Sequence, residues 1–74
     1  MKITYDPEGD VLYIQLREET PTDSIDVEEG VTAELDSEGH LVAIEVLDAS
    51  ERLTAEELTS VSYENLLLAS AKAP

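Results

Sequence analysis

The sequence contains no cysteine, no phenylalanine and no tryptophan. Without cysteine, neither a disulfide nor a thiolate zinc site can stabilise the chain. A domain of 74 residues buries only about 60% of the surface that its unfolded chain exposes, so its core must be thin. Small scaffolds without such cross-links commonly gain stability by association. We therefore expect a homo-oligomer, most simply a dimer, or a complex with another protein.

Basic residues are almost as scarce, because four lysines and arginines oppose eighteen aspartates and glutamates and give a formal net charge of −14. Nucleic-acid phosphates are bound by clustered Lys and Arg, whereas the four here are scattered: Lys2, Arg17, Arg52 and Lys72. We therefore expect no direct binding of nucleic acid. A basic protein partner is favoured electrostatically, although carboxylates that only maintain solubility are the more common case.

Long apolar runs are also missing. Residues 1–10 lack the apolar region of a signal peptide and turn acidic at once, and no stretch reaches the roughly 20 apolar residues of a membrane-spanning helix. We expect no membrane segment and a cytoplasmic location. The length predicts a single domain over residues 1–74, with a β-hairpin sheet over 1–48 and a helical C-terminal segment over 49–74.

Glycine occurs three times, and each copy follows a glutamate: Glu8-Gly9, Glu29-Gly30 and Glu38-Gly39. This pattern predicts hairpin turns in which glycine takes the left-handed conformation. Asp6 and Asp36 precede two of these turns as side-chain acceptors. Residues 5–14 also resemble residues 35–44 at an offset of thirty, so we predict two hairpins of one plan, over 3–16 and 31–48.

Pairing the strands outward from each turn predicts a register. The expected cross-strand pairs are Asp6–Asp10, Tyr5–Val11 and Ile3–Tyr13 in the first hairpin, and Asp36–His40, Leu35–Leu41 and Ala33–Ala43 in the second. Because facing residues share one side of a sheet, this register makes both return strands apolar on both faces. Such a sheet needs two covers, and we expect the second to come from another subunit.

The remaining elements are shorter. Residues 23–27 alternate apolar and acidic residues, as an edge strand does. Thr54 and Glu57 have the spacing of a capping box and predict a helix over about 55–59. For residues 62–71 we favour a helix capped by Ser62, with a strand as the alternative, and we expect residues 71–74 to fray. The predicted fold class is α+β, mainly β: an antiparallel sheet of about five short strands built from β-hairpins, with one or two C-terminal helices.

We find no catalytic constellation and no cofactor motif, so we do not expect an enzyme. The single histidine, His40, lies in a turn and is expected to pair with Asp36 at the surface. The only candidate metal ligands are turn residues: Asp6, Asp10, Asp36 and His40. They lack the spacing of a calcium-binding loop, and the two turns are expected at opposite ends of the sheet. A metal- or small-ligand-binding domain is therefore the alternative hypothesis.

Two runs carry a family resemblance: ITYDPEGDVLYI over residues 3–14 and DSEGHLVAIEVLDAS over residues 36–50. Together they resemble the bacterial family catalogued as Domain of Unknown Function 2283, over residues 1–52. The sequence departs from it at Ala43, where the family more often has glycine, and at Gly9, where alanine is common. The resemblance implies a small β-rich domain with no established activity, and an antitoxin-type binder of small toxin-like proteins. Our leading hypothesis is a small acidic, non-enzymatic protein-interaction module.

Overall fold

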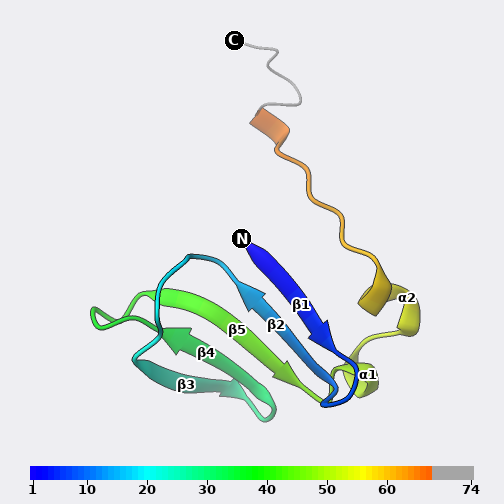
Figure 1. The fold of residues 1–74 in the computed structure, drawn as a ribbon, viewed down its shortest axis with the longest axis horizontal. Coiled ribbons are helices and arrows are strands. Elements are labelled where there is room, and N and C mark those ends of the chain that lie inside the picture. The colour runs from blue at the N-terminus through cyan, green and yellow to red at the C-terminus, as the bar shows by residue number, and fades with distance from the viewer. Residues whose placement is uncertain (68–74) are drawn as a thin grey trace.

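The computed structural model describes residues 1–67 and contains a five-stranded antiparallel sheet followed by two short helices (Figure 1). The predicted fold class is confirmed. The elements, in chain order, are β1 (Lys2–Asp6), β2 (Val11–Gln15), β3 (Asp23–Glu28), β4 (Val31–Leu35), β5 (Leu41–Leu47), α1 (Ala49–Arg52) and α2 (Ala55–Thr59).

The strand order is β1-β2-β5-β4-β3, so the two predicted hairpins meet in the middle of the sheet through β2 and β5. Ile14 lies directly opposite Ile44, and Leu12 lies opposite Val46. The Leu16 N–H donates to the Val42 carbonyl at 2.8 Å, which extends the same pairing. Ile14 therefore faces its own equivalent at an offset of thirty residues, and Leu12 faces the equivalent of Leu16. The sequence similarity corresponds to an approximate two-fold arrangement centred on Ile14 and Ile44.

The connection over residues 16–22 carries the chain from β2 past β5 and β4 to the far edge (Figure 1). It follows the end of the sheet closely, because Leu16 bonds to Val42 and the Thr22 N–H donates to the Leu35 carbonyl at 2.9 Å. The strand that follows, β3, lies at the edge, as its alternating sequence predicts. This route differs from a plain meander, in which each strand would pair with the next.

The register predicted for the first hairpin is wrong by one residue. Asp6 lies opposite Val11, Tyr5 opposite Leu12 and Ile3 opposite Ile14. The reason is the loop, in which Asp10 rather than Gly9 takes the left-handed conformation, with a φ of 58°. An aspartate tolerates this conformation better than most residues. Four loop residues therefore separate the paired strands, where the prediction had three.

The second hairpin matches its predicted register only next to the turn. Leu35 lies opposite Leu41 as expected, but an irregularity between Glu34 and Leu35 then shifts the ladder. Ala33 consequently faces Ile44 and not Ala43. Gly39 takes the left-handed conformation that was predicted for it, with a φ of 84°. A β-bulge of this kind adds one residue to one strand, and turn chemistry alone does not reveal it.

These registers overturn the prediction of two apolar faces. Facing residues share a side, so the observed pairs gather most of the apolar strand residues on one side of the sheet. We call this side the apolar face; its members are Ile3, Tyr5, Leu12, Ile14, Leu16, Ile25, Val31, Ala33, Leu35, Val42, Ile44 and Val46. The other side, which we call the polar face, carries mainly polar residues together with three apolar ones: Lys2, Thr4, Asp6, Val11, Tyr13, Gln15, Ser24, Asp26, Thr32, Glu34, Ala43, Glu45 and Leu47.

The predicted helix over about 55–59 is confirmed as α2. The Thr54 hydroxyl accepts the Glu57 N–H at 3.1 Å, and the Glu57 carboxylate accepts the Thr54 N–H at 2.8 Å. The predicted helix over 62–71 is wrong for residues 62–65, which are extended and irregular, while residues 66 and 67 are helical. Its remainder and the expected fraying of residues 71–74 lie outside the described residues.

The sheet is a single layer with a very small interior. Within residues 1–67, the buried apolar side chains are Ala33, Val42, Ala43 and Ala49. The two helices lie at one end of the sheet, next to the β1–β2 turn, and cover neither face (Figure 1). No helix in the described part of the chain is long and apolar enough to cross a membrane. A layered domain normally packs a second layer on each apolar face, and this chain does not supply one.

Candidate functional site

The four candidate metal ligands do not converge. Val11 pairs with Leu47 at one end of β5, whereas Leu35 pairs with Leu41 at the other. The turn with Asp6 and Asp10 and the turn with Asp36 and His40 therefore lie at opposite ends of the sheet, as predicted. Residues 1–67 include no group of three or more acidic, histidine or cysteine side chains that could hold a metal ion.

Asp6 and Asp36 act as turn acceptors, as expected. The Glu8 N–H donates to Asp6 Oδ1 at 3.0 Å, and the Glu38 N–H donates to Asp36 Oδ1 at 2.9 Å. His40 does contact Asp36, but through its backbone N–H at 2.8 Å. Its imidazole Nε2 lies 3.9 Å from Glu38 Oε1 instead. The exposed imidazole is therefore a turn side chain without a fixed short contact, which fits no catalytic role.

Asp10 connects the first hairpin to α1. Its carboxylate accepts the Ser50 N–H at 2.9 Å, the Ser50 hydroxyl at 2.6 Å and the Tyr5 hydroxyl at 2.7 Å, while its carbonyl accepts the Ala49 N–H. The N-cap residue of α1, Asp48, makes no side-chain cap, so Asp10 supplies the missing acceptors. The bond from Ser50, then that from Tyr5, lowers the pKa of Asp10.

Asp10, Ala49 and Ser50 fall in the two runs that carry the family resemblance. The sequence indicated a turn residue and a candidate metal ligand at Asp10, and it did not predict the contact of Asp10 with Ser50. The structure explains why the two runs occur together. The first run provides the acceptor and the second provides the donors, forty residues apart. These contacts hold the helix against the sheet.

The sequence predicted no contacts for Arg17 and Arg52, and both form hydrogen bonds and ion pairs within the fold. Arg17 Nη2 lies 2.7 Å from Asp36 Oδ2, and its Nε donates to the Leu41 carbonyl at 3.1 Å. This bond from Arg17, with the backbone of His40, lowers the pKa of Asp36 to about 2. Arg17 therefore fastens the 16–22 connection to the β4–β5 turn.

Arg52 fastens the opposite end. Its Nη1 lies 2.8 Å from Glu28 Oε2, its Nε donates to the Leu47 carbonyl at 3.2 Å, and its Nη2 donates to the Glu29 carbonyl. The guanidinium lies against Gly30, whose φ is 85°, and a Cβ at that position would collide with it. No short sequence pattern links either arginine to its carboxylate acceptor, because Asp36 is nineteen residues from Arg17 and Glu28 is twenty-four residues from Arg52.

The polar face is organised around Tyr13. Its hydroxyl donates to Glu34 Oε1 at 2.6 Å, across the intervening strand β5. Ala43 lies between them in the ladder and is fully buried, so a larger residue there would obstruct this contact. The bond to Glu34 raises the pKa of Tyr13 to about 12. Tyr13 is thereby held neutral and oriented at the centre of the face.

Carboxylates surround Tyr13 on this face. Glu45 lies directly opposite it, Thr32 lies opposite Glu45, and Asp26 follows opposite Thr32. Within residues 1–67, the ion pairs at or below 4.0 Å are Arg17–Asp36, Arg52–Glu28 and His40–Glu38. None of them includes Asp26, Glu34 or Glu45, so the negative charge of the polar face is not neutralised by the described side chains.

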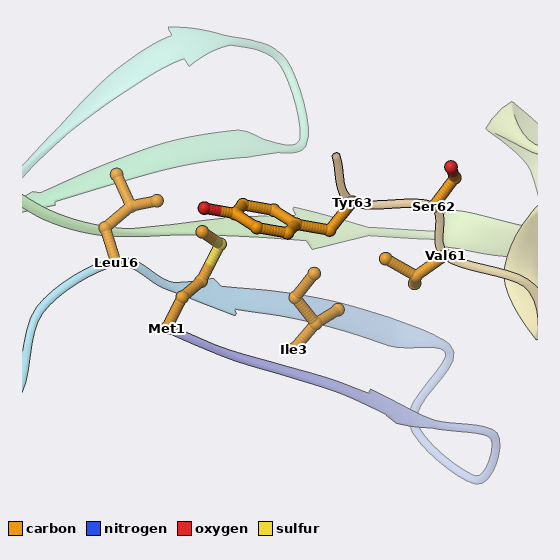
Figure 2. Close-up of a pocket in the computed structure, with 6 residues that line it drawn as sticks. All are labelled: Met1, Ile3, Leu16, Val61, Ser62 and Tyr63. Carbon is orange, nitrogen blue, oxygen red and sulfur yellow. The ribbon is translucent and has the colours of Figure 1, made fainter. Parts of the chain in front are cut away.

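The apolar face is open over much of its area. Ile3 is 38% exposed, Leu16 is 37% exposed and Ile25 is 54% exposed. Near β1, the extended segment over residues 61–63 passes above the face and leaves an apolar groove of about 810 Å³. Figure 2 shows the Tyr63 ring above Met1, directed towards Leu16, with Val61 above Ile3. The side chains that line the groove include no titratable group other than the Tyr63 phenol.

Comparison with known proteins identifies the family but no activity. A search of curated proteins and a search of solved structures each found no significant match. Residues 2–50 match the family model described as a protein of unknown function, DUF2283. The match contains all five strands, Asp10 and its two donors at Ala49 and Ser50. Because the match covers more than half of the sequence, the chain belongs to the DUF2283 family.

Proposed function

We propose that the chain is a small acidic, non-enzymatic protein-interaction module that binds a basic partner protein through its polar face. The observation that carries this proposal is the row of carboxylates around Tyr13, since Asp26, Glu34 and Glu45 share the face and no described cation pairs with them. Both arginines are engaged elsewhere. Lys2 shares the polar face through its pairing with Gln15, but it forms no ion pair with these acids among the described residues.

The arrangement suits guanidinium and ammonium groups. Carboxylates form their strongest hydrogen bonds with ionised donors, and arginine can engage a carboxylate with two parallel bonds. The ring of Tyr13 lies between these acids and provides an aromatic surface beside which a cation is stabilised. A net charge of −14 also attracts a basic protein over a distance and raises its association rate.

The family resemblance narrows the kind of partner. It implies an antitoxin-type binder, and a small basic toxin-like protein that acts on RNA must bind phosphates with clustered Lys and Arg. A surface with several carboxylates at fixed spacing can occupy such a phosphate-binding site. On this proposal the module inhibits its partner by electrostatic competition, and it needs no cofactor or catalytic residue.

The test is capture of a partner from the native host with the purified chain as bait, followed by binding measurements with the partner so identified. Glu34→Lys/Glu45→Lys alters the polar face, while Glu18→Lys/Glu19→Lys changes the net charge equally in the exposed 16–22 connection. We expect the captured partner to be basic. Its affinity should be at least about tenfold weaker in 500 mM than in 50 mM NaCl, because salt screens charge. Glu34→Lys/Glu45→Lys should lose a comparable amount of affinity, and Glu18→Lys/Glu19→Lys should not.

Far-UV circular dichroism of both variants establishes that each keeps its sheet. Equal losses of affinity in the two variants would mean that the net charge of the protein, and not the polar face, determines binding. Recovery of no basic protein at low salt, or binding that does not change with salt, would overturn the proposal.

A further inference from the structure

We infer that the apolar face is a homodimer interface, on which a second copy of the chain stacks face to face. This surface is the opposite side of the sheet from the one proposed to bind a basic partner, and the inference does not depend on that proposal. It starts from the single-layer architecture, in which the described chain covers neither face.

The size of the interior shows that something is missing. Among the described residues the only fully buried side chain larger than alanine is Val42. Ile14 and Ile44, at the centre of the sheet, are only partly buried. Partial exposure of these two central isoleucines is unusual, because burial of such side chains is the main source of folding free energy. A second sheet about 10 Å above the first would bury both of them.

The apolar face offers exposed side chains to a second copy. Ile3, Leu16 and Ile25 on this face are 38%, 37% and 54% exposed, and Val61 and Tyr63 beside it are 67% and 75% exposed. A standard interface buries roughly 800 Å² on each partner, and the apolar face extends across all five strands of the sheet.

Charge identifies the occupant as a second copy. Two chains of net charge −14 repel each other at most orientations, but no charged residue on β1, β2, β4 or β5 takes a position on the apolar face. The negative side chains are on the polar face, in the turns and on β3. On the edge strand β3, Asp23 and Glu28 lie opposite Leu35 and Val31 of the apolar face, and Glu28 is paired with Arg52. The part of the face formed by β1, β2, β4 and β5 is therefore where two copies can meet without placing carboxylates against one another.

Shape supports the same occupant. Two sheets pack well when their twists match and their strands lie within about 30° of each other, and an identical copy supplies a sheet of the same width and twist. The approximate two-fold arrangement around Ile14 and Ile44 gives both halves of the face similar apolar rows. The groove bounded by Ile3, Leu16 and Tyr63 (Figure 2) lies at the rim and would receive side chains of the partner. The dimer would display both polar faces outward.

The experiment uses two matched pairs of variants on the edge strands. Ile3→Asp and Thr4→Asp add one carboxylate at neighbouring positions on opposite faces of β1, and Ile25→Asp and Ser24→Asp do so on β3. All four positions are exposed, so each variant should keep its fold, as far-UV circular dichroism will verify. Sedimentation equilibrium of the full chain then gives the dimer dissociation constant at 50 and 500 mM NaCl.

We expect a dimer whose dissociation constant falls as salt rises, because salt screens the repulsion between two acidic chains. Ile3→Asp and Ile25→Asp should weaken it at least about tenfold, and Thr4→Asp and Ser24→Asp less than threefold. A monomer at millimolar concentration, equal weakening by both members of a pair, or a dimer insensitive to Ile3→Asp and Ile25→Asp would overturn the inference. Binding of a basic protein weakens with salt instead, so either proposal can fail while the other stands.

Discussion

The β1–β2 turn and the β4–β5 turn begin with the same aspartate hydrogen bond, but they differ in length and in the residue that takes the left-handed conformation. In each, an aspartate side chain accepts the N–H two residues ahead. The first loop then places Asp10 in the left-handed conformation, and the second places Gly39 there. Four residues separate the paired strands in the first and five in the second. The irregularity between Glu34 and Leu35 compensates for this difference of one residue, so that Ala33 faces Ile44 as Ile3 faces Ile14. A shift of one residue would otherwise exchange the faces, because side chains alternate along a strand.

The two turns also differ in what their carboxylates hold. Asp10 binds the start of α1 through Ser50, and Asp36 binds Arg17 of the crossover connection. Both contacts lower the pKa of the aspartate, the first mainly through the Ser50 hydroxyl and the second mainly through the Arg17 guanidinium. An aspartate at the end of the first turn thus holds a helix, whereas an aspartate at the start of the other turn holds a loop.

The largest expected effect tests whether Ile14 and Ile44 hold equivalent positions in the two hairpins. Ile14→Asp and Ile44→Asp should each destabilise the fold by about 3 kcal/mol or more, because a carboxylate would replace an apolar partner at the centre of the sheet. Gln15→Asp, next to Ile14 but on the polar face, should cost less than about 1 kcal/mol. Urea denaturation measures all three. Loss in only one isoleucine variant would contradict their equivalence.

A smaller effect separates the turns at their glycines. Gly39→Ala should destabilise the protein by about 1–2 kcal/mol, because its φ of 84° is costly for a residue with a Cβ. Gly9 is outside that region, and a Cβ there would meet Asp6 Oδ2 at 3.1 Å, a side-chain atom that can move. Gly9→Ala should therefore stay within about 0.5 kcal/mol of the parent. Thermal and urea unfolding give the comparison, and equal costs would refute the loop geometry.

The smallest effect is the pH dependence that Asp36 contributes. Its pKa is about 2 in the fold against 3.8 in the reference state, so its stabilising contribution is present above about pH 4 and is lost as the pH falls towards 2. Arg17→Ala should raise the pKa of Asp36 and reduce the slope of stability in that window. Carboxyl NMR titration of Asp36 checks the shift directly, and an unchanged pKa in Arg17→Ala would disprove the role of the guanidinium.

The sequence predicted the parts of the fold that depend on neighbouring residues. The edge strand at residues 23–27, the capping box of Thr54 and Glu57, and the acceptor roles of Asp6 and Asp36 are all short-range features. They are confirmed because hydrogen bonds between residues two to four positions apart leave a direct pattern in the chain. The separation of the two acidic turns was also predicted, although the strand order that produces it is not a meander.

The features that were missed depend on residues far apart. The pairing of Ile14 with Ile44, the bonds from Asp10 to Ser50, and the two arginine contacts join residues nineteen to forty positions apart. The predicted helix at 62–65 failed for a related reason, since helix propensity is a weak prior that tertiary context overrides. The sequence predicted apolar surface on the sheet and an acidic binding surface, but it assigned several residues to the wrong face of the sheet.

By itself, then, the sequence determined the acidity of this protein, its β-hairpins, its turn acceptors and its family resemblance, all of which follow from composition and local spacing. Only the tertiary structure shows that Asp10 takes the left-handed conformation, that a bulge lies between Glu34 and Leu35, and that β2 lies beside β5. Those three features place most of the apolar strand residues on one face and the carboxylates around Tyr13 on the other. Strand register has a period of two residues, so a shift of one exchanges the faces, and local sequence carries too little information to exclude that shift.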